Sequence, residues 1–123
     1  MSQIFVVSND NARVRAMVGA FVNAGYSATG ATTFAEAHVR LASEPADVVI
    51  ADERLGAYNG LHILLTARAM HPCADLIVTT AEQNRGLEAD ARSLNVHCMV
   101  RPQSVTDWIA PITEMLNPVA RVA

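Results

Sequence analysis

The sequence predicts an α/β domain in which a parallel five-stranded sheet is covered by helices on both faces. Apolar runs and helical patterns alternate five times along the chain, as is typical of strand–helix–strand units. At least four of the five runs are continuously apolar, which indicates parallel strands that are buried on both faces. The length of 123 residues suits one compact domain with one core.

The individual elements follow from local patterns of apolar residues. Short apolar runs predict strands, and apolar residues at every third or fourth position predict helices. Strands are expected at residues 4–7, 26–32, 47–52, 76–80 and 96–100. Helices are expected at residues 12–24, 34–43, 61–71, 82–94 and 105–116.

The first two strand–helix pairs are supported unequally. The first strand is a continuous apolar run that ends in a polar turn, whereas the second is only weakly patterned. The first helix places Val14, Met17 and Phe21 on one face, and Gly25 is suited to end it. Thr33 is the expected N-cap of the second helix.

The remaining elements have clearer boundaries. The third strand is uniformly apolar until it ends at Asp52. The third helix begins after Gly60 and stops before Pro72, and the fourth strand is rich in β-branched residues. Pro102 stops the fifth strand, and apolar residues around Trp108 support a last helix.

The right-handed crossover rule leaves few sheet orders for a chain of this length. We predict the flavodoxin-like order 2-1-3-4-5, a doubly wound (βα)5 sandwich. The domain is expected to span residues 1–118, with residues 119–123 as a tail or the start of a linker.

Composition excludes several classes of function. The net charge of −3 implies no broad attraction to nucleic acid, and no nucleic-acid binding is expected from this domain. No apolar run approaches the roughly 18 residues that span a membrane, so no membrane association is expected. Cys73 and Cys98 have no metal-binding spacing, which fits a cytoplasmic protein.

Polar residues follow several of the predicted strands. The carboxyl ends of parallel strands meet at one edge of a sheet, and ligands bind at that edge in open α/β folds. Asp52 ends the central strand there. The neighbouring strand ends contribute Ser8, Asn9, Asp10, Thr79, Thr80 and Arg101. A carboxylate, hydroxyl groups and a cation therefore converge from distant parts of the chain.

Three short motifs lie on these strand ends. They are Asp-x-x-Leu-x-x-x-x-Gly from Asp52 to Gly60, the pair Thr80-Ala81, and a basic residue before proline at Arg101. In this order and on these elements, the chain resembles the receiver domain of bacterial response regulators in two-component signalling. The resemblance extends from residue 4 to about residue 116.

The resemblance implies a role for each of these residues. Asp52 matches the residue that accepts a phosphoryl group from a histidine kinase or phosphotransfer protein. Thr80 matches the hydroxyl that contacts this group and repositions on activation, and Arg101 matches a lysine that contacts a phosphoryl oxygen. Ala81 matches a donor of a backbone N–H to the phosphate. Cys98 stands at the position of an aromatic switch residue.

A metal is also implied by the resemblance. Asp52 and the backbone carbonyl of Arg54 match Mg²⁺ ligands, and Asp10 is a further candidate if the preceding turn slips. Glu53 and Glu82 are expected at the rim of the site, and the backbone N–H of Glu53 is a second phosphate donor.

The chain departs from the family in ways that weaken this metal site. Ser8 and Asn9 stand where the family places two acidic residues. The charges of Asp52, Arg101, Arg54 and Glu82 sum to zero. No uncompensated anion then attracts Mg²⁺, so we expect magnesium to bind weakly or not at all. Arg13 and Arg15, at the start of the first helix, are expected on a solvated face.

Three functions are compatible with these observations. The favoured one is a non-enzymatic signal-transduction receiver domain with Asp52 at the phosphoacceptor position and impaired Mg²⁺-dependent phosphorylation. The alternative is a pseudo-receiver that works without phosphorylation as an interaction or dimerisation module, through the face formed by the fourth helix, fifth strand and fifth helix. The third is an unrelated flavodoxin-like enzyme or ligand binder, for which the sequence offers no nucleophile–base pair.

Overall fold

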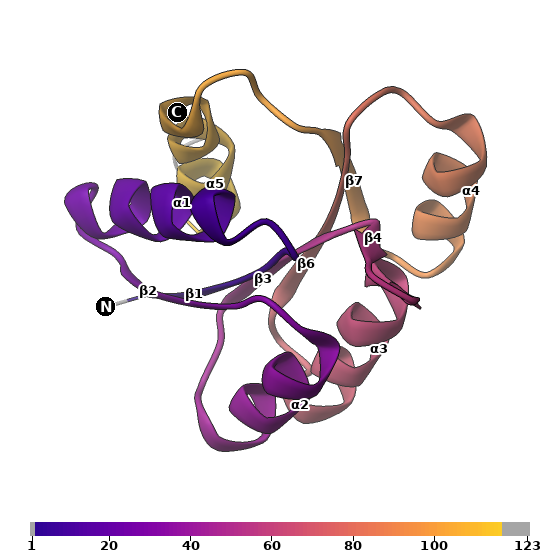
Figure 1. The fold of residues 1–123 in the computed structure, drawn as a ribbon, viewed down its shortest axis with the longest axis horizontal. Helices are drawn as coiled ribbons and strands as arrows, with labels where there is room; N and C mark the ends of the chain where they lie inside the picture. Colours follow the sequence, from indigo (N-terminus) through magenta and orange to yellow (C-terminus); the bar gives the residue numbers. More distant parts are fainter. Residues whose placement is uncertain (1, 117–123) are drawn as a thin grey trace.

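The computed structural model describes residues 2–116, and its centre is a five-stranded parallel sheet in the order β2-β1-β3-β6-β7 (Figure 1). These strands are β1 (Gln3–Val7), β2 (Ser27–Ala31), β3 (Val48–Asp52), β6 (Asp75–Thr80) and β7 (His97–Val100). The expected domain end at residue 118 and the tail at residues 119–123 lie outside the described residues.

Helices cover both faces of the sheet (Figure 1). One face carries α1 (Asn11–Asn23), the 3₁₀ turn η1 (Val105–Trp108) and α5 (Ile109–Leu116). The other face carries α2 (Phe34–Ser43), α3 (Gly60–Met70) and α4 (Arg85–Ser93). Within the described residues, no helix combines the length and the apolar character needed to cross a membrane.

The predicted fold class and strand order are confirmed. The order of the large sheet is the expected 2-1-3-4-5 when its strands are counted alone, because β4 and β5 form a separate small sheet. Every residue of β3 is buried, which accounts for its uniformly apolar sequence up to Asp52. Its apolar residues separate into two cores: Val49 and Ala51 face α2, α3 and α4, whereas Val48 and Ile50 face α1 and α5.

The loop after β3 is more ordered than the sequence predicted. Residues 54–59 lie between the expected third strand and third helix and were assigned to neither, but β4 (Arg54–Leu55) and β5 (Tyr58–Asn59) pair as a short antiparallel hairpin. Gly56 adopts a φ of +65° in its turn, a conformation that glycine adopts without strain. The Tyr58 ring stacks on Phe34 of α2, with centroids 4.3 Å apart and planes 17° apart.

Two predicted helix boundaries were wrong. The fourth helix begins at Arg85 and not at residue 82, because the Asn84 side chain accepts a hydrogen bond from the Leu87 backbone N–H and caps the helix there. The last helical segment starts with a 3₁₀ turn at Val105 before α5 begins at Ile109.

Candidate functional site

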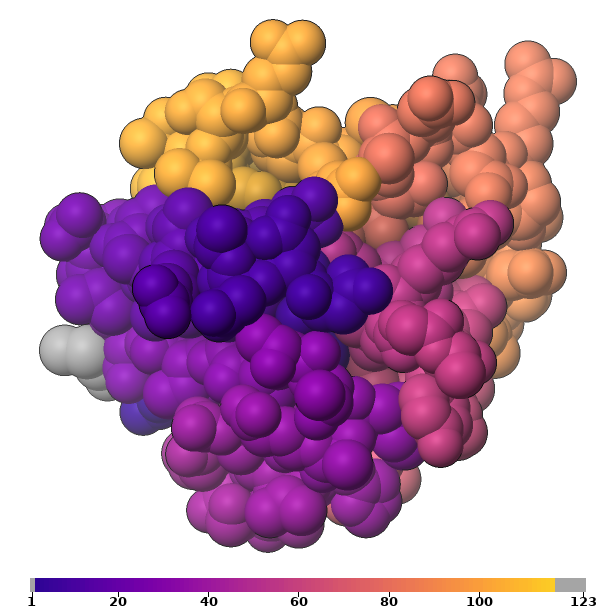
Figure 2. Space-filling model, viewed as in Figure 1, coloured from indigo at the N-terminus to yellow at the C-terminus, as the bar shows by residue number. Residues whose placement is uncertain are grey.

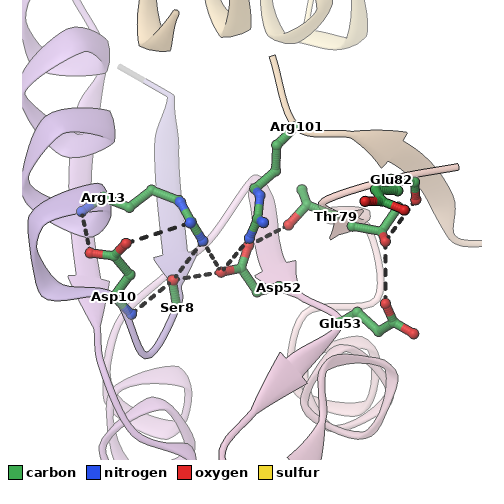
Figure 3. Close-up of polar contacts among 9 residues, drawn as sticks. Ser8, Asp10, Arg13, Asp52, Glu53, Thr79, Glu82 and Arg101 are labelled. Atoms are coloured by element: carbon green, nitrogen blue, oxygen red, sulfur yellow. Dashed lines mark hydrogen bonds and ion pairs between the residues drawn. The ribbon is translucent and has the colours of Figure 1, made fainter. Parts of the chain in front are cut away.

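The carboxylate of Asp52 lies at the end of β3 and is held by four side chains (Figure 3). Its Oδ1 accepts a hydrogen bond from the Thr79 hydroxyl at 2.5 Å. Its Oδ2 accepts from the Ser8 hydroxyl at 2.5 Å and from Arg13 Nη1 at 2.6 Å. Arg101 Nη1 lies 3.5 Å from the same Oδ2. Both carboxylate oxygens are therefore engaged within the protein.

The parallel sheet brings these groups together. In the register of β3 and β6, Asp52 lies directly beside Thr79. Ser8 follows β1, the strand on the other side of β3, and its backbone N–H donates to the Ala31 carbonyl of β2. Arg101 follows β7, and its backbone N–H donates to the Thr80 carbonyl. Each side chain thus projects from a strand end at the same sheet edge.

Arg13 is the contact of Asp52 that the sequence did not predict. It was expected on a solvated face, and that expectation was wrong: only 28% of its side chain is exposed and its guanidinium contacts Asp52. Asp10 is the N-cap of α1 and accepts from the Arg13 backbone N–H at 3.1 Å. The sequence did contain a signal for this contact. A helix that directly follows a strand begins at the sheet edge where that strand ends, so the first turn of the first helix lies near Asp52.

A second group of polar residues lies toward the rim. The Thr80 hydroxyl is 2.9 Å from the Glu82 carbonyl and 3.2 Å from Glu53 Oε2. Asn84 Nδ2 donates to Glu53 Oε1 at 3.3 Å. Among the described contacts of Asp52, the hydroxyl partner from β6 is Thr79 and not Thr80. The sequence had indicated a role for Thr80 and had assigned none to Thr79.

Comparison with solved structures identifies the fold. No protein-family model and no curated protein sequence matches the chain. The structure is similar to a CheY-like response regulator receiver domain protein from Methanospirillum hungatei, with a TM-score of 0.87 and 18% identity, covering 100% of this chain and 99% of that one. The chain has the receiver fold.

Two further solved structures show the same receiver fold. A response regulator from Thermotoga maritima has a TM-score of 0.83 at 18% identity, covering 95% of this chain and 98% of that one. A response regulator from Burkholderia pseudomallei, solved with a phosphorylated aspartic acid, a calcium ion and citrate, has a TM-score of 0.83 at 18% identity. That match covers 100% of this chain and 74% of the other.

The edge of the receiver fold above Asp52 is hollowed into a cavity of about 300 Å³. It is lined by Asn9, Asp10, Arg13, Asp52, Glu53, Arg54, Thr80, Ala81 and Arg101. Most of the site residues predicted from the sequence therefore lie around this one cavity. Figure 2 shows the start of α1, in indigo, beside the magenta segment that follows β3 on this face.

Cys98 lies apart from this cavity of the receiver fold. It is half-buried in β7 and, with Glu88 of α4, lines a separate cavity of about 350 Å³. Burial raises the pKa of the Cys98 thiol, and the carboxylates of Glu88 and Glu53 act in the same direction. The thiol is therefore protonated at neutral pH, and the side chain packs partly against the core.

The oxygen atoms available at this site of the receiver fold do not fit a divalent metal. Mg²⁺ prefers several oxygen ligands, including one or two carboxylates. The oxygens of Asp52 already accept from hydroxyl and guanidinium groups, and Asp10 pairs with Arg13 at 3.5 Å. Over residues 2–116, no three His, Cys, Asp or Glu side chains are grouped so that they could hold a metal ion. The charges of Asp10, Arg13, Asp52 and Arg101 sum to zero.

Proposed function

We propose that the chain is a signal-transduction receiver domain with Asp52 at the phosphoacceptor position and with impaired Mg²⁺-dependent phosphorylation. The receiver fold and the place of Asp52 at the end of β3 support the first part of the proposal. The engagement of both Asp52 oxygens by Ser8, Arg13 and Thr79 is the observation that supports the second part.

The chemistry of phosphoryl transfer explains why this engagement matters. A carboxylate oxygen must attack phosphorus in line as the bond to the donor breaks, while cations neutralise the equatorial oxygens. Two guanidinium groups and two hydroxyls stabilise the Asp52 carboxylate before any donor arrives. Stabilisation of the ground state without equal stabilisation of the transition state slows the reaction.

The partner of such a domain is a histidine kinase or a phosphotransfer protein. The similar receiver from Burkholderia pseudomallei was solved with a phosphorylated aspartic acid and a calcium ion, which supports the phosphorylation of an aspartate on this fold. In the present chain, Arg101 and the backbone N–H of Ala81 would face a phosphoryl group at Asp52, since both residues line the cavity. The backbone N–H of Glu53, expected from the sequence as a second phosphate donor, instead donates to the Thr79 carbonyl at 2.7 Å.

A second candidate is a pseudo-receiver that acts as an interaction or dimerisation module without phosphorylation. Two observations favour it. The charge of Asp52 is matched inside the protein, and β7 is an edge strand in which Val100 is 48% exposed. The face formed by α4, β7 and α5 would carry the interaction. This candidate predicts that partner binding is unchanged in Asp52→Asn.

Mass spectrometry after treatment with acetyl phosphate tests the proposal. The protein is incubated with and without Mg²⁺, and Asp52→Asn serves as the control. We expect a small fraction with one added phosphate, absent from Asp52→Asn and little changed by Mg²⁺. Rapid, complete and Mg²⁺-dependent phosphorylation would contradict the impairment. No phosphorylation, together with no amide NMR response to beryllofluoride, would favour the pseudo-receiver.

A further inference from the structure

We infer that Arg13 is an internal counter-ion that supplies to Asp52 the positive charge a divalent cation would supply, and that it excludes Mg²⁺ independently of the residues at positions 8 and 9. The inference rests on the proposed place of Asp52 as the phosphoacceptor. It assigns a positioning role to a residue of α1 that carries none of the sequence motifs.

The contact between Arg13 and Asp52 is close and partly desolvated. Arg13 Nη1 lies 2.6 Å from Oδ2, whereas Arg101 Nη1 is 3.5 Å from the same oxygen. The Asp52 side chain is 9% exposed and that of Arg13 is 28% exposed. Charges removed from water in this way interact more strongly and are screened less by salt. Arg13 is therefore the main counter-ion of Asp52.

Arg13 is also held in place from its own side. Its Nη2 pairs with Asp10 at 3.5 Å, and its Nη1 lies 3.4 Å from the Ser8 hydroxyl oxygen. Ser8 Oγ in turn accepts from the Asp10 backbone N–H at 3.1 Å. Because Asp10 and Ser8 already hold the guanidinium, less side-chain entropy remains to be lost when it contacts Asp52.

This arrangement makes Arg13 act on two carboxylates at once. It neutralises Asp52, and it pairs with Asp10, the nearest other acid at this sheet edge that the sequence had offered as a metal ligand. Acidic residues restored at positions 8 and 9 would thus still compete with a guanidinium for Mg²⁺. Removal of Arg13 is therefore expected to raise the affinity for Mg²⁺ even when those acids are present.

Magnesium titrations of matched variants, followed by amide NMR shifts, test this dependence. The variants are the parent chain, Arg13→Ala, Ser8→Asp/Asn9→Asp and the triple variant that combines all three substitutions. Ser8→Asp/Asn9→Asp/Arg15→Ala is the matched control, since Arg15 lies on the same helix and is exposed. Thermal melts establish that each variant is folded, and Arg13→Gln replaces Arg13→Ala in any variant that is not.

We expect the triple variant to bind Mg²⁺ at least about tenfold more tightly than Ser8→Asp/Asn9→Asp, because one nearby cation has been removed. The Arg15 control is expected to match Ser8→Asp/Asn9→Asp. Equal affinities with and without Arg13 would overturn the inference, and so would an equal gain from Arg15→Ala. Neither outcome bears on the phosphorylation assay of the parent chain, so the two proposals fail separately.

Discussion

Arg13 Nη1 lies 2.6 Å from Oδ2 of Asp52, although the two residues are 39 positions apart in the chain. This ion pair is shorter than the contact of Arg101 Nη1 with the same oxygen, which measures 3.5 Å. It links the first turn of α1 to the end of the central strand. The Asp52 carboxylate is consequently expected to stabilise the folded protein.

Replacing Asp52 is expected to destabilise the protein. Asp52→Asn keeps the shape of the side chain but leaves Arg13 and Arg101 without their shared anion, so we expect a loss of about 1–3 kcal/mol in the free energy of unfolding. Chemical denaturation measures this loss. The exposed Asp90 of α4 is the control, and Asp90→Asn is expected to change stability by less than about 0.5 kcal/mol. A stabilising effect of Asp52→Asn would contradict this expectation and show that the cost of desolvating the carboxylate exceeds its attraction to the two arginines.

Gly60 is expected to tolerate no side chain. A Cβ at this position would lie 2.0 Å from the Asp52 carbonyl oxygen, so the backbone of the site would have to move. We expect Gly60→Ala to cost about 2–4 kcal/mol and to shift the amide resonances around Asp52. Gly19 lies within α1 and has no atom within 4 Å of such a Cβ. Gly19→Ala is therefore expected to stabilise the protein by up to about 1 kcal/mol; equal effects of the two substitutions would contradict the close approach.

The two cysteines are expected to react at different rates. Burial raises the pKa of the Cys98 thiol above its ordinary value of 9.0, whereas Cys73 is exposed. Iodoacetamide at pH 8 should label Cys73 first, as read by peptide mass spectrometry. Because burial disfavours the Cys98 thiolate in the folded protein, the free energy of unfolding is unaffected by this thiol well below pH 9. It falls as the pH rises from the unfolded pKa, near 9.0, through the higher folded pKa. Faster labelling of Cys98 in the folded protein would contradict the burial.

The stacked rings of Tyr58 and Phe34 are expected to hold the hairpin of β4 and β5 in place. Their centroids are 4.3 Å apart, and a double-mutant cycle with alanine should give a coupling of about 0.5–1.5 kcal/mol. Hydrogen exchange of residues 54–59 should accelerate in Tyr58→Ala. The control is Val39→Ala, at an exposed position on α2, which is expected to leave the exchange of residues 54–59 unchanged. Unchanged exchange in the hairpin would show that its backbone pairing suffices.

Most of the fold could be predicted because its signals are local. The uniformly apolar β3 and the turn residue Gly60 mark their elements within a few positions. The order of the strands followed from general rules of chirality and connection. The short hairpin could not be predicted, since Tyr58 stacks on Phe34, a contact between residues 24 positions apart that no local pattern specifies.

The site was predicted only where strand ends define it. Asp52 and Arg101 each stand at the end of an apolar run. The structure brings their side chains together at the carboxyl edge of the sheet. Arg13 could not be assigned from periodicity, because its long side chain reaches back past the helix start to Asp52. The choice between Thr79 and Thr80 depends on the register of β6 against β3, which no local pattern specifies.

The Phe34–Tyr58 stack has a consequence for how a signal could leave the site. The hairpin begins two residues after Asp52, and its Tyr58 ring lies against the first residue of α2. A displacement of the carboxylate end of β3 would therefore be transmitted sideways to α2 through two aromatic rings. The packing of α2 would then change together with the position of the Asp52 carboxylate.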